Sequence, residues 1–478
     1  MQLIHKAALL LGVMTAGLSF SMYGQKPVTS PYSMGTPVNY IRTWTPTAPT
    51  ADASGLPGKG LTEVKEATRY FDGLGRPLQT VVKKGSMVTT DVNNVATDAA
   101  GAKDQVTPVL YDAFGREQYQ FSPYASTSSD GLLKTDPFSE LLGASGAKYG
   151  SQGEDNYYSQ TVFEASPLNR VMEQFAPGKN WAGTATQSVH RSIKTDYRVN
   201  TATDAVRIWT VNHVAPAVPV ASDYTASGVY PAGELYKNVT EDEHQKQVVE
   251  FKDKAGQVIL KKVQLTAAKD GGVGSGHDGW ICTYYIYDDL NRLRCVIQPE
   301  GVKALAGNGW QLTSNLLSEQ CFRYEYDDRS RMVVKKVSGA AEVVMVYDVR
   351  DRLVMTQDGN QRGTSSYGYW LYTQYDNLNR PVKTGLLSAN NTPATHWNAA
   401  MSKTGDTNAD IQYPDANSLS FTTPLTQTFY DDYSWVDDPY NNVNISNTAG
   451  FKAFDELHNS YLLGASNTIF PYAQAPAK

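Results

Sequence analysis

The sequence predicts an all-β protein built from tandem β-hairpins. From Thr62 onward, short segments alternate apolar and polar residues and are rich in Val, Thr and Tyr, and Gly, Asn and Asp interrupt them as turn formers. Tyrosine is frequent, with 30 residues, and suits a half-buried strand because its ring packs while its hydroxyl stays hydrated. A six-residue pattern also recurs along the chain. No long helical periodicity competes with this prediction.

The first 24 residues have the features of a secretory signal peptide. His5 and Lys6 form a weakly basic start, an apolar run follows over residues 7–20, and small residues surround the expected cleavage sites near Ser21 and after Gly24. The run is too short to cross a bilayer, and no later run approaches that length. We therefore expect an exported chain without a membrane span, in the periplasm, on the cell surface or secreted. The alternative is a buried N-terminal helix.

The remaining chain divides by composition. Residues 25–61 are rich in Pro, Thr, Gly and Ser and are expected to form a flexible leader, with one short edge strand over 39–44. An N-terminal β domain is expected over 62–270, a Gly-rich linker over 271–279, a region of tandem hairpins over 280–435 and a loosely ordered tail over 436–478. Short helices are expected at 137–142 and 301–305, and a long surface loop at 388–418.

The recurring pattern reads aromatic residue, Asp, two variable positions, turn former, Arg. It occurs six times, which identifies it as a repeat. Its residues are Phe71, Asp72, Gly75 and Arg76; Tyr111, Asp112, Gly115 and Arg116; Tyr287, Asp288, Asn291 and Arg292; Tyr326, Asp327 and Arg331; Tyr347, Asp348 and Arg352; and Tyr375, Asp376, Asn379 and Arg380. A diverged copy at 251–257 keeps the turn but has Gln257 in place of Arg.

The spacing of this pattern is typical of a hairpin turn. Asp at the first turn position and Gly or Asn at the fourth are preferred in type I turns, where the Asp oxygen accepts backbone N–H groups. The Arg then begins the return strand, where it can stack on the aromatic ring or pair with the Asp carboxylate. A single hairpin is marginally stable, so neighbouring hairpins are expected to depend on one another.

These residues resemble the YD repeats of bacterial RHS proteins, and the interval from Tyr326 to Tyr347 is typical of that family. The N-terminal half resembles the uncharacterised domain that opens many secreted RHS-like proteins, in the segments 70–81, 109–125, 164–171 and 176–178. The resemblance covers roughly residues 39–435. It implies strands that spiral into a shell, which in some members encloses a toxin. We therefore expect an N-terminal portion of such a shell.

Charge and motif content argue against several other classes of protein. The net charge of −6 supplies no basic surface for nucleic acid. Histidines such as His190, His213, His244 and His277 show no metal-ligand spacing, and the Gly-rich stretch 271–279 lacks the Lys-Ser/Thr of a phosphate-binding loop. Because an acid that recurs in every repeat has the same local role each time, we expect no catalytic residue, no cofactor and no metal. The acidic pairs Asp327–Asp328, Asp431–Asp432 and Asp437–Asp438 could bind calcium, but solvated loops are favoured.

Cys282, Cys295 and Cys321 lie close together in the sequence. In an oxidising compartment two of them could pair, although three small apolar residues on strands are favoured.

The function that these observations favour is an exported scaffold, not an enzyme, that encloses or presents a polypeptide cargo such as a toxin. The alternative is cell-surface adhesion or glycan binding through exposed aromatic residues. Trp280, Trp310, Trp370 and Trp435 could stack on sugars, although such residues more often belong to the core.

Overall fold

The computed structural model describes residues 27, 29–32, 38–51, 53–86, 101–154, 156–182, 191–363, 368–388, 391–405, 407–415, 422–430 and 473–474. The expected signal peptide and nearly all of the tail lie outside these ranges. The described residues form antiparallel hairpins with a few short helices, so the prediction of an all-β protein is confirmed. Two compact units divide the chain: unit 1 comprises residues 1–198 and 238–248, and unit 2 comprises residues 199–237 and 249–478.

Unit 1 contains one antiparallel sheet in which strands follow each other mostly in chain order. Its strands are β1 (Asn39–Pro46), β2 (Val64–Phe71), β3 (Pro77–Val82), β4 (Gln105–Tyr111), β5 (Glu117–Phe121), β6 (Tyr124–Ala125), β7 (Tyr158–Phe163), β8 (Val171–Phe175) and β9 (Ser192–Val199). One helix, α1 (Pro137–Tyr149), begins where the Asp136 carboxylate accepts the Ser139 N–H at 3.3 Å and Pro137 occupies the first turn.

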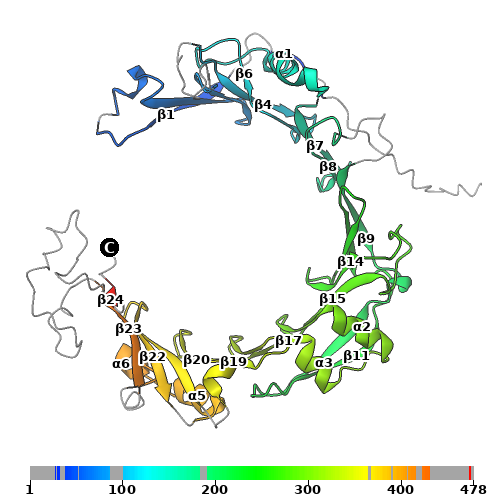
Figure 1. The fold of residues 1–478 in the computed structure, drawn as a ribbon, viewed down its shortest axis with the longest axis vertical. Coiled ribbons are helices and arrows are strands. Elements are labelled where there is room, and N and C mark those ends of the chain that lie inside the picture. The colour runs from blue at the N-terminus through cyan, green and yellow to red at the C-terminus, as the bar shows by residue number, and fades with distance from the viewer. Residues whose placement is uncertain are drawn as a thin grey trace, which may run out of the picture. The chain divides into compact units, whose positions relative to one another are not determined.

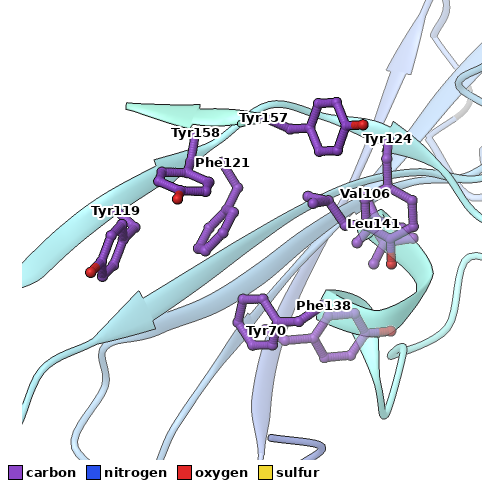
Figure 2. Packing of buried hydrophobic residues seen from close by; sticks show 10 residues of the cluster. Tyr70, Val106, Tyr119, Phe121, Tyr124, Phe138, Leu141, Tyr157 and Tyr158 are labelled. Atoms are coloured by element: carbon purple, nitrogen blue, oxygen red, sulfur yellow. The ribbon is translucent and has the colours of Figure 1, made fainter. Parts of the chain in front are cut away.

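Helix α1 covers the apolar core of unit 1. Phe138 and Leu141 of this helix pack with Tyr119, Phe121 and Tyr158 of the sheet (Figure 2). The ring of Tyr119 meets that of Tyr158 edge-on, with centroids 5.4 Å apart, and Phe121 lies 5.3 Å from Phe138. Tyrosine therefore supplies much of the core, as the composition indicates.

Unit 2 continues the hairpin pattern. The division between the units falls within β12 (Tyr236–Glu241) and β13 (Gln247–Lys252). The further strands are β10 (Arg207–Asn212), β11 (Asp223–Val229), β14 (Val258–Gln264), β15 (Trp280–Tyr287), β16 (Leu293–Ile297), β17 (Cys321–Tyr326), β18 (Met332–Lys336), β19 (Glu342–Tyr347), β20 (Leu353–Gln357), β21 (Tyr369–Tyr375), β22 (Pro381–Ser388), β23 (Thr422–Thr428) and β24 (Ala473–Gln474). The helices are α2 (Pro299–Gly307), α3 (Ser314–Glu319), α4 (Gly359–Arg362), α5 (Pro393–Met401) and α6 (Asn408–Ile411). Short 3₁₀ turns occupy Leu56–Gly58 and Gly150–Gln152 in unit 1 and Ala202–Asp204 in unit 2.

The helices of unit 2 and the β10–β11 hairpin lie on one face of its sheet, where α2, α3 and α5 contact β15, β17 and β19 (Figure 1). Arg294 and Arg323 form hydrogen bonds that hold residues 220–222, which precede β11, against this face. Arg294 donates to the Ser222 hydroxyl at 3.0 Å and pairs with Glu325, and Arg323 donates to the Val220 carbonyl at 3.2 Å. All three charged side chains are buried, so this layer depends on their pairing.

The expectation of a long surface loop over 388–418 is wrong. Helices α5 and α6 lie within this segment, and the Thr392 side chain caps α5 by accepting the Thr395 N–H at 3.2 Å. Trp397 donates its indole N–H to the Met345 carbonyl at 2.8 Å, and buried His396 contacts Trp370. The Asn- and Thr-rich composition that indicated a loop instead supplies helix caps.

The Gly-rich stretch 271–279 lies inside unit 2, and the division between the units falls elsewhere. Lys262 reaches across to it and donates to the Ser275 carbonyl at 2.6 Å and to its hydroxyl at 2.8 Å. Gly274 has a φ of 87°, and a Cβ on this residue would clash with the Thr201 hydroxyl, so the close approach of the two segments requires glycine there. The expected domain bounds stay predictions.

Cys282, Cys295 and Cys321 are free thiols, all buried on strands. Burial raises the pKa of Cys282 to about 11, so its thiol stays protonated. These residues act as small apolar side chains of the covered face.

His396 makes unit 2 sensitive to acid. Burial lowers the pKa of His396 to about 4, from 6.5 for an exposed ring. Between these two values the unfolded chain binds a proton that the native histidine does not, so stability falls as the pH falls, by about 3 kcal/mol at pH 4. Urea unfolding at a series of pH values should show this loss in the wild type and a smaller one in His396→Gln. An equal pH dependence in both proteins would contradict the assignment.

Candidate functional site

The repeated turns share one local geometry, which we call the Asp–Arg turn: the segment from the repeat Asp to the repeat Arg. In the first of them the Gly75 N–H donates to the Asp72 carbonyl at 3.0 Å, and the Asp72 N–H donates to the Arg76 carbonyl at 2.9 Å. The fourth residue has a positive φ, 79° at Gly75. The same bonds recur in the turns that start at Asp112, Asp242, Asp253, Asp288, Asp327, Asp348 and Asp376.

The Asp side chain holds each turn with both of its oxygens. In Asp348, Oδ1 accepts the N–H groups of Arg350 and Arg352 at 2.9 and 3.0 Å, and Oδ2 accepts the Arg352 Nε at 2.7 Å. All six predicted repeats have this arrangement, with Nε to Oδ2 distances of 2.7–2.8 Å. These contacts lower the pKa of Asp376, although its burial alone would raise it. The carboxylates are thus committed to the turns.

The repeat Arg also reaches the next turn along the sheet. Arg352 donates from Nη1 to the Asn379 side chain at 3.2 Å, and its guanidinium lies 5.0 Å from the centre of the Tyr375 ring. Guanidinium–ring distances of 4.4–5.2 Å join Arg76 to Tyr111, Arg116 to Phe163, Arg170 to Tyr197, Arg292 to Tyr326, Arg331 to Tyr347, Arg352 to Tyr375 and Arg380 to Tyr430. We call this series of contacts the arginine ladder. It exists within each unit.

The aromatic residue completes the contact between neighbouring repeats. The Tyr375 hydroxyl donates to the Leu353 carbonyl at 2.8 Å, directly after the Arg that covers its ring. Tyr326 reaches Leu293 in the same way at 3.0 Å, and Tyr430 reaches Pro381 at 3.1 Å. In these three pairs the later hairpin therefore contacts the earlier one through both its ring and its hydroxyl.

The sequence prediction left open whether the Arg stacks on a ring or pairs with the Asp. The Arg pairs with its own Asp and also covers the aromatic ring of the following hairpin; Arg116 in addition lies 5.0 Å from the ring of Phe114 in its own turn. In the diverged copy, Gln257 takes the place of the Arg and still reaches the next turn, where its side-chain amide donates to the Asn291 carbonyl at 3.1 Å.

Two turns were missed in the sequence. The turn from Asp242 to Lys246 lacks an aromatic residue before its Asp and has Gln245 at the fourth position with a φ of 63°. In the other, Glu164 replaces Asp and pairs with Arg170 at 2.7 Å. An acidic residue four to six positions before a basic one, flanked by alternating segments, is the signal that could have found both.

A β-bulge with one extra residue follows every repeat Arg. In the return strand β20, Tyr347 pairs with Leu353 but Val346 pairs with Met355, so Val354 is an extra residue. The same shift occurs in β3, β5, β8, β16, β18 and β22. It places two consecutive residues, such as Val354 and Met355, in the core, which strict alternation does not predict.

The face of the unit 2 sheet opposite the helices is lined mainly by apolar side chains. Cross-strand partners show which residues share it: Tyr285 pairs with Val296, Val296 with Phe322, and Leu371 with Leu386. We call this surface the open face; its apolar members are Tyr285, Val296, Phe322, Tyr324, Val343, Met345, Leu371 and Leu386, all half-buried. Its polar members include Thr283, Lys335, Thr356, Thr373 and Thr384. No described helix of unit 2 covers this face (Figure 1).

The remaining predicted candidates are tryptophans, a histidine and pairs of acidic residues. Trp280 and Trp370 are buried, Trp310 is half-buried against Arg207, and Trp435 and His190 lie outside the described residues. Asp327 belongs to an Asp–Arg turn and Asp328 is exposed beside it, while the pairs at 431–432 and 437–438 are not among the described residues. Within the described ranges, no group of three His, Cys, Asp or Glu side chains could hold a metal, and no helix is long and apolar enough to cross a bilayer.

The fourth turn position offers a test of the backbone geometry. Because Gln245 has a positive φ, Gln245→Gly should raise the free energy of unfolding by about 1 kcal/mol. Gly256→Ala is the matched control in the next turn: its Cβ would meet no atom within 4 Å, so the expected loss of about 1 kcal/mol comes from the φ of 84° alone. Urea unfolding measures both; effects of the same sign would contradict this geometry.

Comparisons with known proteins match part of the chain. Residues 42–197 match a family model described as a domain of unknown function, DUF6443. No curated protein matches the sequence. One similar solved structure is the Tc holotoxin pore of Photorhabdus luminescens with a mutated TccC3, at 14% identity and a TM-score of 0.41, covering 69% of this chain and 13% of that one. The complex of TcdB2, TccC3 and Cdc42 gives 14% identity and a TM-score of 0.40 over 71% of this chain and 14% of that one. Residues 42–197 are therefore similar to DUF6443, and the chain spans about one seventh of the length of these toxin chains.

Proposed function

We propose that this chain is an exported scaffold of the RHS/YD-repeat kind, whose open face encloses or presents a polypeptide cargo such as a toxin. The observation that carries the proposal is the open face itself. Eight apolar side chains from neighbouring strands share one surface that none of the described helices covers. An apolar surface of this kind favours unfolded polypeptide, whose apolar side chains are accessible.

The arginine ladder supports a scaffold because it couples each hairpin to the next. A sheet of coupled hairpins keeps its form while a ligand binds, which lowers the entropic cost of binding. The carboxylates of the Asp–Arg turns accept N–H groups with both oxygens, so a catalytic role is not proposed for them. The proposed location outside the cytoplasm rests on the signal-peptide features of residues 1–24.

Binding to an unfolded polypeptide tests this function. Fluorescence anisotropy with a labelled, permanently unfolded polypeptide should show saturable binding, and the natively folded form of the same polypeptide should not bind. Tyr324→Asp and Leu371→Asp place a charge on the open face and should weaken binding about tenfold or more. Leu290→Asp, at an exposed turn tip, is the matched control and should bind as the wild type does. Absence of binding by the wild type, or equal affinity in all variants, would refute the proposal.

A further inference from the structure

We propose that strand β1 is an interface through which two copies of this chain pair edge to edge. β1 pairs with β2 along its whole length, from Asn39 opposite Phe71 to Pro46 opposite Val64, without a register shift. Among the described strands, β2 is the one whose residues pair with β1, and the other element that contacts β1 is the short turn Leu56–Gly58. Eight residues of unbulged strand therefore present their outward N–H and C=O groups as a template for another strand.

The edge lacks the features by which natural sheets prevent such pairing. Lysine is absent from β1, no bulge twists it, and its one proline, Pro46, is the last residue. The single charged residue of β1, Arg42, contacts the neighbouring strand β2: its Nε donates to the Thr68 hydroxyl at 2.9 Å and lies 3.4 Å from the Glu66 carboxylate. The outward edge therefore carries no repelling charge.

Two large apolar side chains stand exposed on this edge strand. Tyr40 is 59% exposed and Ile41 is 63% exposed, and as neighbours in a strand they occupy opposite faces. A strand added alongside would cover both faces at once. The open strand edge and the exposed side chains thus coincide in one place.

The β1 sequence is complementary to itself in an antiparallel register centred on Ile41. A twofold axis through Ile41 places Ile41 opposite its copy, Tyr40 opposite Arg42 of the other chain, and Asn39 opposite Thr43. Arg42 already lies 5.4 Å from the Tyr40 ring within one chain, so the cross-strand pair extends an existing contact. An axis through Arg42 would instead oppose two guanidinium groups, which is unfavourable. A second copy of this chain is therefore the partner that fits.

Sedimentation equilibrium of the full chain tests this pairing. The wild type should show a concentration-dependent dimer of the 52.4 kDa chain. Ile41→Lys and Ile41→Glu each place like charges opposite one another at the axis and should be monomers. An equimolar mixture of the two should form a heterodimer, because lysine then faces glutamate. Leu74→Lys, at an exposed turn tip of the same unit, is the control and should dimerise as the wild type does.

Three outcomes would overturn the proposal. A wild type that stays monomeric at every concentration removes the interface. A dimer that persists in both Ile41 variants means that the two Ile41 side chains do not face each other, which contradicts the proposed pairing. Monomeric single variants whose mixture does not pair exclude the register through Ile41. Cargo binding by the open face is measured separately, so it can succeed or fail independently of this result.

Discussion

Replacing Asp348 with Ala is expected to lower the free energy of unfolding by about 3–5 kcal/mol. The Asp348 side chain is fully buried and that of Arg352 is 9% exposed, so the substitution leaves a guanidinium without its partner in a low dielectric. It also removes the acceptor of two backbone N–H groups. Urea unfolding followed by tryptophan fluorescence measures the change.

Asp376→Ala is the matched control for Asp348→Ala. The local contacts are the same, with N–H donors at 2.8 and 2.9 Å and the Arg380 Nε at 2.7 Å, but Asp376 and Arg380 are 22% and 32% exposed. Water can solvate the remaining Arg, so a loss of about 1–2 kcal/mol is expected. Equal losses at the two positions would show that burial does not determine the strength of the ladder.

Replacing Lys237 with Met should be comparably harmful, at about 3–5 kcal/mol. The Lys237 ammonium lies 2.7 Å from Asp204 and 2.5 Å from Asp270, and all three side chains are buried in unit 2. Without the cation, two carboxylates face each other away from water. The Gly-rich stretch should loosen as well, because the Ser275 N–H donates to Asp204 at 3.2 Å.

A double variant identifies the cause of this loss. Adding Asp270→Asn to Lys237→Met removes one of the unpaired charges and should recover part of the stability. Lys252→Met, which removes a partly exposed lysine paired with Glu250 at 3.4 Å, is the control and should change stability by less than about 1 kcal/mol. No recovery in the double variant would mean that lost packing, and not unpaired charge, destabilises Lys237→Met.

The hairpins could be predicted because their signals are local. Asp at the first turn position and Gly or Asn at the fourth determine the turn within a few residues of sequence, as at Asp72 and Gly75. The edge strand at 39–44 and the helices near 137–142 and 301–305 also follow from local patterns and are present as β1, α1 and α2. Local patterns did not predict α5, because its stability depends on contacts of His396 and Trp397 with distant strands.

The ladder could not be predicted because it depends on which hairpins are neighbours. Arg292 and Tyr326 come from different repeats, and nothing in either pattern specifies their pairing across β16 and β17. The bulge at Arg294 turns this residue to the covered face, where it meets Glu325. The open face likewise emerges only when strand register shows that residues such as Tyr285 and Phe322 lie on one surface.

Hydrogen exchange of Arg352→Met tests most directly the claim that each Arg couples two turns. Arg352 pairs with Asp348 in its own turn and contacts Tyr375 and Asn379 of the next. We predict faster amide exchange in both turns, at 348–352 and at 376–380, while Lys303→Met, which removes an exposed lysine of α2, leaves both unchanged. Faster exchange confined to 348–352 would contradict the account, since the hairpins would then be stabilised singly and not through the arginine ladder.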